Sequence, residues 1–148
     1  EMCIRDSGGF IGKDIRFCRG CLACQKLGKC VINDDVDGIM QKVLHADVVV
    51  WATPIYYFEM SGQMKVLIDR MNALYTLDYQ FRDVYMLTTA AEEEPEVPSR
   101  AISGLTGWTD CFPKSRLAGT LFCGGVVEPN AISGHSKLDQ AYEMGLHC

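Results

Sequence analysis

The chain has 148 residues, of which 48% are hydrophobic and 22% charged, and its formal net charge is −5. This composition predicts a single globular domain with a real core and excludes a disordered chain. The acidic balance argues against nucleic acid or an anionic membrane surface as partner, and no apolar run approaches the ~18 residues that span a bilayer. Eight cysteines, four of them between positions 18 and 30, favour a metal or redox site in a reducing compartment, so we expect a cytoplasmic protein.

The first elements surround the cysteines. Residues 1–7 (EMCIRDS) continue no hydrophobic period, and we interpret them as non-native and exclude them from the fold. Residues 15–18 form a short strand candidate that leads into the cysteine run. Asp34 and Asp35 then offer an N-cap and a negative first turn to a helix. The apolar face of that helix follows a spacing of three and four: Val36, Ile39, Met40, Val43 and Leu44.

The middle of the chain begins with a continuous apolar run at residues 48–52, which predicts a parallel strand buried on both faces. Pro54 is expected to end this strand, and residues 53–60 to form an aromatic loop. Ser61 is the predicted N-cap of a second helix. Its apolar stripe comprises Met64, Leu67, Ile68, Met71 and Leu74.

The second half repeats the same rhythm. We expect a strand at residues 84–87 that ends in Thr88 and Thr89, an acidic loop at 92–98, a helix near 101–112, a strand at 117–122 and a final helix from Leu138. Alternating strands and helices predict an α/β fold with a doubly wound parallel sheet. Ligands of such sheets bind at the carboxyl ends of the strands, so the loops after Ala52, Leu87 and Phe122 form the candidate site.

The cysteine spacing is the most specific motif: Cys18-x2-Cys21-x2-Cys24-x5-Cys30. An unbroken run of this kind is typical of [4Fe–4S] sites, whereas structural zinc usually takes two separated Cys-x2-Cys pairs. The spacing therefore favours an iron–sulfur cluster, with free or redox-active thiols and zinc as the alternatives. The remaining thiols outside residues 1–7 have no ligand spacing and are expected to be buried: Cys111, Cys123 and Cys148.

A family resemblance rests on three runs: residues 52–58 (ATPIYYF), 61–65 (SGQMK) and 68–70 (IDR). They resemble the NADPH-dependent FMN reductase-like family, and the cysteine run makes the chain most similar to its iron–sulfur flavoprotein branch. Residues 107–108, 117–120 and 141–145 fit the same branch.

The resemblance implies a flavodoxin-like fold of strand order 2-1-3-4-5 with FMN at the switch point, and a [4Fe–4S] cluster on the four cysteines. It also implies flavin contacts from Thr53, Pro54, Ile55, Tyr56, Tyr57, Thr88, Thr89 and Ala90.

One part of the family pattern is not found. The family binds the FMN phosphate with a Ser/Thr/Asn-rich loop at the N-terminus of its first helix, where backbone N–H groups favour an anion. Nothing before Asp14 can play that part. We therefore expect one N-terminally truncated domain over residues 1–148 that lacks the first strand, the phosphate loop and the first helix.

The expected function is an FMN-dependent oxidoreductase that moves electrons from NAD(P)H through flavin to a small-molecule or protein acceptor, by way of the cluster if one is present. The flavin carries the chemistry, so we name no catalytic side chain. The alternatives are a non-enzymatic electron carrier and a zinc-stapled, flavin-free interaction domain. The family also implies a homo-oligomer, with Tyr75 and Tyr79 as candidate interface aromatics. Lys65 and Asp69 are expected to form a surface ion pair.

Overall fold

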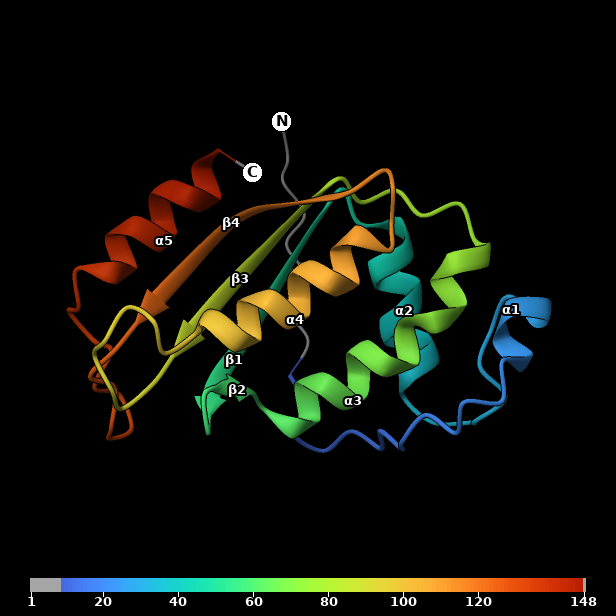
Figure 1. Ribbon diagram of the computed structural model, residues 1–148, viewed down its shortest axis with the longest axis horizontal. Coiled ribbons are helices and arrows are strands. Elements are labelled where there is room, and N and C mark those ends of the chain that lie inside the picture. Colours follow the sequence, from blue (N-terminus) through green and yellow to red (C-terminus); the bar gives the residue numbers. More distant parts are fainter. Residues whose placement is uncertain (1–8, 148) are drawn as a thin grey trace.

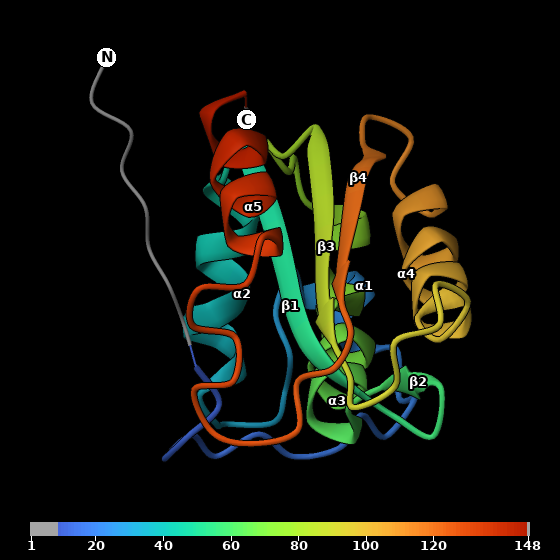
Figure 2. The same cartoon turned by 90° about the vertical axis from the view of Figure 1, so that its left-hand side faces the viewer.

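The computed structural model describes residues 9–147, so the expectations for residues 1–7 and for Cys148 lie outside it. Its centre is a four-stranded sheet of order β2-β1-β3-β4. The strands are β1 (Val48–Tyr56), β2 (Glu59–Met60), β3 (Asp83–Thr89) and β4 (Arg116–Cys123). β1, β3 and β4 are parallel, whereas β2 folds back antiparallel onto the end of β1. Figure 2 shows the three parallel strands side by side. The predicted α/β class with a parallel-dominated sheet is confirmed.

The helices flank this sheet on both sides. They are α1 (Ala23–Leu27), α2 (Val36–His45), α3 (Gly62–Arg70), the 3-10 helix η1 (Met71–Thr76), α4 (Ser99–Asp110) and α5 (Lys137–Leu146). Figure 1 shows α5 on one side of the strands and α2, α3 and α4 on the other. Among the described helices, none is long and apolar enough to cross a membrane.

The apolar stripe predicted for the second helix is confirmed. All five stripe residues of the second helix are buried, although the α-helix ends at Arg70 and the stripe continues through η1. Ser61 is the N-cap, and its hydroxyl accepts a hydrogen bond from the Met64 N–H at 3.3 Å. At the start of α2, the Asp34 carboxylate accepts the Val36 N–H at 3.2 Å.

The prediction that the 48–52 strand is buried on both faces is wrong. Burial alternates along β1, so that Val49, Trp51 and Ile55 are buried while Val50 is 49% exposed. The buried face lies in one core with residues of α2, α3, η1 and α4. The opposite face is covered less completely, because α5 is its only described helix and has no buried residue. An apolar run alone could not distinguish these two environments.

The strand predicted at residues 15–18 is also wrong. These residues form no strand, and their backbone is held by side chains instead. The Arg16 N–H donates to the Asp34 carboxylate at 3.0 Å, and the neighbouring Asp14 N–H donates to Asp35 at 2.7 Å. Without a neighbouring strand, this short segment satisfies its polar groups locally.

Pro54 does not end β1, contrary to the sequence prediction. It pairs with Thr89 as the last parallel register position, and β1 then continues into a tight hairpin with β2. The turn consists of Tyr57 and Phe58, with φ of 52° and 65°. Such left-handed values at both turn positions match the twist of a two-residue hairpin, although the turn usually uses Asn and Gly.

The aromatic part of the core corrects one further expectation. Tyr79 is 7% exposed and packs at 4.5 Å from Phe81, so it is not an exposed interface residue. Its hydroxyl accepts the Lys114 N–H at 2.8 Å. Tyr75 is 48% exposed. Of the thiols expected to be buried, Cys123 is buried but Cys111 is exposed.

Candidate functional site

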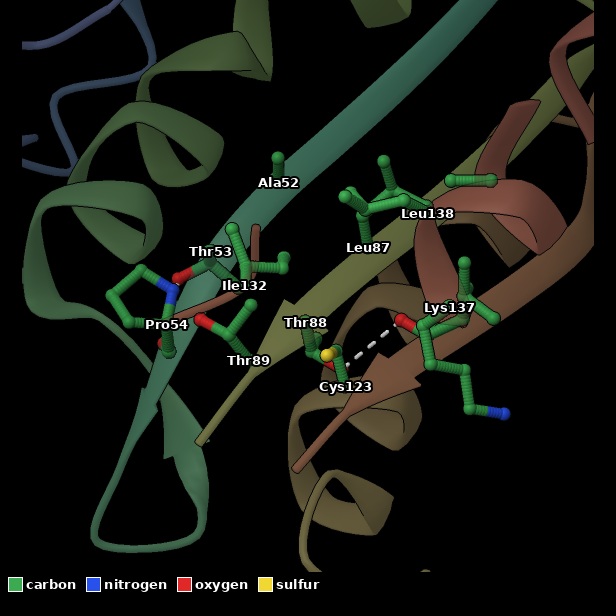
Figure 3. Close-up of a pocket in the computed structure, with 12 residues that line it drawn as sticks. Ala52, Thr53, Pro54, Leu87, Thr88, Thr89, Cys123, Ile132, Lys137 and Leu138 are labelled. Atoms are coloured by element: carbon green, nitrogen blue, oxygen red, sulfur yellow. Dashed lines mark hydrogen bonds between the residues drawn. The ribbon is translucent and has the colours of Figure 1, made fainter. Parts of the chain in front are cut away.

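A cavity of about 380 Å³ lies at the carboxyl ends of the parallel strands and under α5 (Figure 3). Its volume falls within the roughly 300–1,000 Å³ typical of small-molecule sites. The lining is mostly apolar and comes from three strands, from α5 and from the segment before α5: Ala52, Thr53, Pro54, Leu87, Thr88, Thr89, Leu121, Cys123, Ile132, Lys137, Leu138 and Ala141.

The floor of this cavity is built by strand register. Ala52, Leu87 and Leu121 are partners across β1, β3 and β4, and so form one row. Two residues further on, Pro54, Thr89 and Cys123 form a second row. Because side chains alternate along a strand, both rows lie on the same face of the sheet. Two parallel rows of small and medium side chains make a flat, largely apolar surface.

Four of the eight predicted flavin contacts line the cavity: Thr53, Pro54, Thr88 and Thr89. The other four do not. Ile55 and Ala90 are buried, and Tyr56 and Tyr57 are 59% and 97% exposed at the hairpin. The Ala90 backbone is already paired, since its N–H donates to Cys123 O at 3.2 Å and its carbonyl accepts the Val126 N–H at 2.8 Å.

Thr53 connects the cavity to the neighbouring helix. Its hydroxyl donates to the Pro54 carbonyl at 2.9 Å and accepts the Ser61 N–H at 3.0 Å. The side chain is buried, and these two bonds fix the hairpin and the start of α3 against the end of β1. Thr53 therefore shapes the cavity through its position as well as its surface.

Sequence reasoning missed the α5 side of the cavity. Ile132, Lys137, Leu138 and Ala141 line it, together with Leu121 and Cys123 of β4. The general rule for strand ends had indicated the loop after Phe122, but nothing local showed which face of the last helix turns toward the sheet. Lys137 is the one lining residue with a permanent charge, and its amine donates to Gln140 Oε1 at 3.0 Å.

Glycines close the edge of the site. A Cβ on Gly124 would lie 2.5 Å from the Glu92 carbonyl oxygen and 2.7 Å from the Glu93 Cα. Gly125 follows with a φ of 71°, and its N–H donates to the Glu92 carbonyl at 3.3 Å. Only residues without a side chain allow the loop after β3 to pack this closely on the end of β4.

The chemistry of this cavity fits the ring of a flavin. A ring of this kind needs a flat apolar surface, polar groups at one edge and protection from bulk water. The two register rows provide the surface, the backbone at the strand ends around Thr53 and Thr88 brings polar groups, and Leu138 and Ala141 cover the opposite side.

A second, smaller pocket contains all four cysteines of the motif. Cys18, Cys21, Cys24 and Cys30 line it together with Asp69, Arg70 and Asn72 at the end of α3 and the start of η1. The Gly20 N–H donates to Cys18 Sγ at 3.4 Å, and the Asn72 amide donates to Cys24 Sγ at 3.4 Å. Within residues 9–147, no three His, Cys, Asp or Glu side chains are placed to hold a single metal ion.

Four thiols around one pocket nevertheless suit an iron–sulfur cluster. In a [4Fe–4S] cluster each thiolate binds a different iron, so the sulfur atoms surround the cluster rather than converge on one point. The donor set of this pocket therefore fits the cluster better than a single zinc ion.

A buried ion pair holds this pocket against α3. The side chains of Arg70 and Asp34 are both fully buried, with Nη1–Oδ2 and Nη2–Oδ1 distances of 2.7 and 3.0 Å. Burial alone would raise the pKa of Asp34, but hydrogen bonds from Arg70 and from the N–H groups of Arg16 and Val36 lower it overall. Sequence reasoning had considered only the Lys65–Asp69 pair, which is present on the surface at 2.5 Å.

Comparison with known proteins agrees with this geometry. The family model described as NADPH-dependent FMN reductase matches residues 9–94, more than half of the chain. An iron–sulfur flavoprotein of Archaeoglobus fulgidus is 44% identical over 59 residues, which cover 40% of this chain and 27% of that protein. Another, from Methanocaldococcus jannaschii, is 39% identical over 71 residues, covering 48% and 36%. The matched segment thus spans well under half the length of these curated relatives.

Solved structures share the fold at low identity. The Trp repressor binding protein of Bacillus subtilis aligns with a TM-score of 0.57 and 22% identity over 72% of this chain and 73% of that one. An NAD(P)H:quinone oxidoreductase of Methanothermobacter marburgensis aligns with a TM-score of 0.53 and 16% identity over 82% and 66%. These alignments support a flavodoxin-like fold, and the complete strand order 2-1-3-4-5 stays a prediction.

Proposed function

The chain belongs to the NADPH-dependent FMN reductase family, and we propose that it is a member of the iron–sulfur flavoprotein branch and holds the flavin ring of an oxidoreductase that moves electrons from NAD(P)H to an acceptor. The observation that carries this proposal is the flat floor formed by the two register rows at the strand ends. When bound, FMN supplies the hydride-accepting and electron-donating chemistry.

Different residues of the cavity are proposed to contact different parts of the flavin ring. The rows that contain Ala52 and Pro54 support one face of the ring, and Leu138 and Ala141 shield it from water. The backbone at the strand ends around Thr53 and Thr88 serves its polar edge. A preformed apolar site of this kind orients the ring and limits its contact with solvent.

The remaining predicted contacts are kept as part of the proposal. Tyr56 is the last residue of β1 and Tyr57 begins the exposed turn after it, and we propose that both contact the outer edge of the ring. Ile55 and Ala90 are buried next to lining residues and support the floor from behind. No side chain is assigned as acid, base or nucleophile.

We further propose that electrons leave through a [4Fe–4S] cluster on Cys18, Cys21, Cys24 and Cys30. The helix α3 connects the flavin cavity with the cysteine pocket. The Ser61 N–H at its start donates a hydrogen bond to the Thr53 hydroxyl, and Arg70 at its end lines the cysteine pocket. Its nine residues span about 14 Å. We propose a small molecule or a protein as the final acceptor and a homo-oligomer as the assembly, with the exposed Tyr75 as the candidate interface residue.

The test compares two tryptophan substitutions on α5. Ala141 lines the cavity, whereas the adjacent Tyr142 is 65% exposed and does not. Ala141→Trp should fill the cavity and abolish FMN retention and NADPH oxidation, while Tyr142→Trp should keep both. Equal FMN retention by the two variants would contradict the proposed site.

The same preparation separates the alternative functions. If the FMN-loaded protein does not oxidise NADPH but is reduced by a ferredoxin-type protein, it is an electron carrier. If it contains zinc without iron and takes up no flavin, the zinc-stapled interaction domain is correct. Anaerobic absorption spectra and metal analysis distinguish these outcomes.

A further inference from the structure

We infer that Arg70 and Asn72 set the reduction potential of the iron–sulfur cluster by donating hydrogen bonds to its sulfur atoms. The inference rests on the proposed function, because it requires a cluster on the four cysteines. It assigns to these two residues a positioning and tuning role toward the cluster.

The first observation is an unused donor on Arg70. Its Nη1 donates to the Asp34 carboxylate at 2.7 Å and to the Arg16 carbonyl at 2.6 Å, and its Nη2 donates to the second oxygen of Asp34 at 3.0 Å. Its Nε has no hydrogen-bond partner among residues 9–147, although the side chain is fully buried. Buried N–H groups are almost always paired, so an orphan of this kind calls for an acceptor.

The acceptor that fits is sulfur in the cysteine pocket. Arg70 lines that pocket together with all four cysteines. Burial alone would lower the pKa of Arg70, but the hydrogen bond to Asp34 and then the charge of Cys30 raise it overall. A guanidinium fixed by a carboxylate from behind keeps its charge and cannot turn away from the pocket.

The second observation is independent of the first. The Asn72 side-chain amide donates to Cys24 Sγ at 3.4 Å. Asn72 stands two residues after Arg70, at the beginning of η1, so the two donors reach the pocket from the same end of α3. Together they give the pocket two side-chain N–H donors, one of them on a guanidinium whose charge is paired with Asp34.

Hydrogen-bond donors near an iron–sulfur cluster raise its reduction potential. Four thiolates concentrate negative charge, and reduction adds one more electron while no bond forms or breaks. Hydrogen bonds to sulfur and a nearby positive charge stabilise the reduced state more than the oxidised state, and so raise the reduction potential. Removing a donor should make the cluster harder to reduce.

The experiment uses protein reconstituted anaerobically with iron and sulfide and titrated with dithionite, with cluster absorbance and electron paramagnetic resonance as readouts. Asn72→Leu removes one donor, and Arg70→Lys keeps the charge but removes the planar fork. We expect Arg70→Lys to lower the ratio of reduced to oxidised cluster about tenfold at a fixed potential, a shift of about 59 mV for a one-electron couple. Asn72→Leu should lower the same ratio several-fold.

Arg116→Gln is the control, because Arg116 is an exposed cation at the start of β4 whose Nε pairs with Asp83 at 2.6 Å, and neither residue lines the cysteine pocket. It should leave the potential unchanged. If Arg70→Lys does not fold, Asn72→Leu decides the question alone. If both variants hold a cluster at the wild-type potential, the inference is wrong while the proposed cluster stands. If the wild-type protein takes up no iron, the proposed cluster fails and the inference with it.

Discussion

Breaking the Arg70–Asp34 pair by removing one partner should cost more stability than breaking any other ion pair in residues 9–147. Both side chains are fully buried and the contact is bidentate. The Asp34 carboxylate also accepts a hydrogen bond from the Arg16 N–H at 3.0 Å. Arg70→Met removes the cation but leaves the carboxylate buried. Leaving one member of a buried pair without its partner costs about 3–5 kcal/mol, against a total of about 5–15 kcal/mol for a typical domain.

Urea denaturation at neutral pH measures this cost. Lys65→Met is the control, since the exposed Lys65–Asp69 pair is worth at most ~0.5 kcal/mol. A double variant, Arg70→Met with Asp34→Leu, should recover much of the loss because no buried charge is left. If Arg70→Met destabilises the protein by less than about 1 kcal/mol, the buried pair does not hold the cysteine pocket against α3 as proposed.

The same pair predicts how stability depends on pH. Although burial alone would raise it, the pKa of Asp34 is lowered overall by its hydrogen bonds with Arg70 and with backbone N–H groups. A group whose folded pKa lies below its unfolded value of ~3.9 stabilises the fold above that pH and loses this contribution as the pH falls through the folded value. Asp34→Asn should therefore reduce the steepness of acid unfolding below about pH 4, and an unchanged acid transition would count against this account.

Three further substitutions test local features. Ser61→Ala removes the cap on the Met64 N–H and should cost about 1 kcal/mol in urea denaturation; no loss would show that the cap is unimportant. Gly124→Ala places a methyl group 2.5 Å from the Glu92 carbonyl, so both thermal stability and FMN affinity should fall, and wild-type values for both would contradict the tight packing. Phe58→Gly removes the strain of a φ of 65°, so the melting temperature should rise and the free energy of unfolding should increase by up to about 1 kcal/mol. A lower melting temperature would mean that the contacts of the Phe58 ring stabilise the fold by more than the backbone strain destabilises it.

Local sequence patterns predicted where helices and strands lie better than they predicted which faces of them are buried. The spacing of Met64, Leu67 and Ile68 correctly identified a buried helix face, and Ser61 correctly marked its start. The apolar run of β1 could not reveal that one of its faces is only partly covered, because that depends on a helix about 90 residues later. Pro54 could remain within the strand because it sits at the last parallel pair, where the missing N–H is tolerated.

The site was predictable only in its strand half. The rule that ligands bind at strand ends selected the loops after Ala52 and Leu87. The family resemblance then named the residues within them that line the cavity: Thr53, Pro54, Thr88 and Thr89. The contribution of Ala141 depends on how α5 crosses the sheet, which no local signal encodes.

The cysteine pocket shows the same limit. Its ligand spacing is local and was read from the sequence, whereas the Asp34–Arg70 pair joins residues 36 positions apart. A pair so distant leaves no local signal in a single sequence.

A crystal structure of the protein with bound FMN would test the central claim most directly. We expect the flavin ring to lie on the floor formed by Ala52, Leu87 and Leu121, with Leu138 on its opposite side. A ring bound elsewhere, with this floor still open to solvent, would contradict the proposed site.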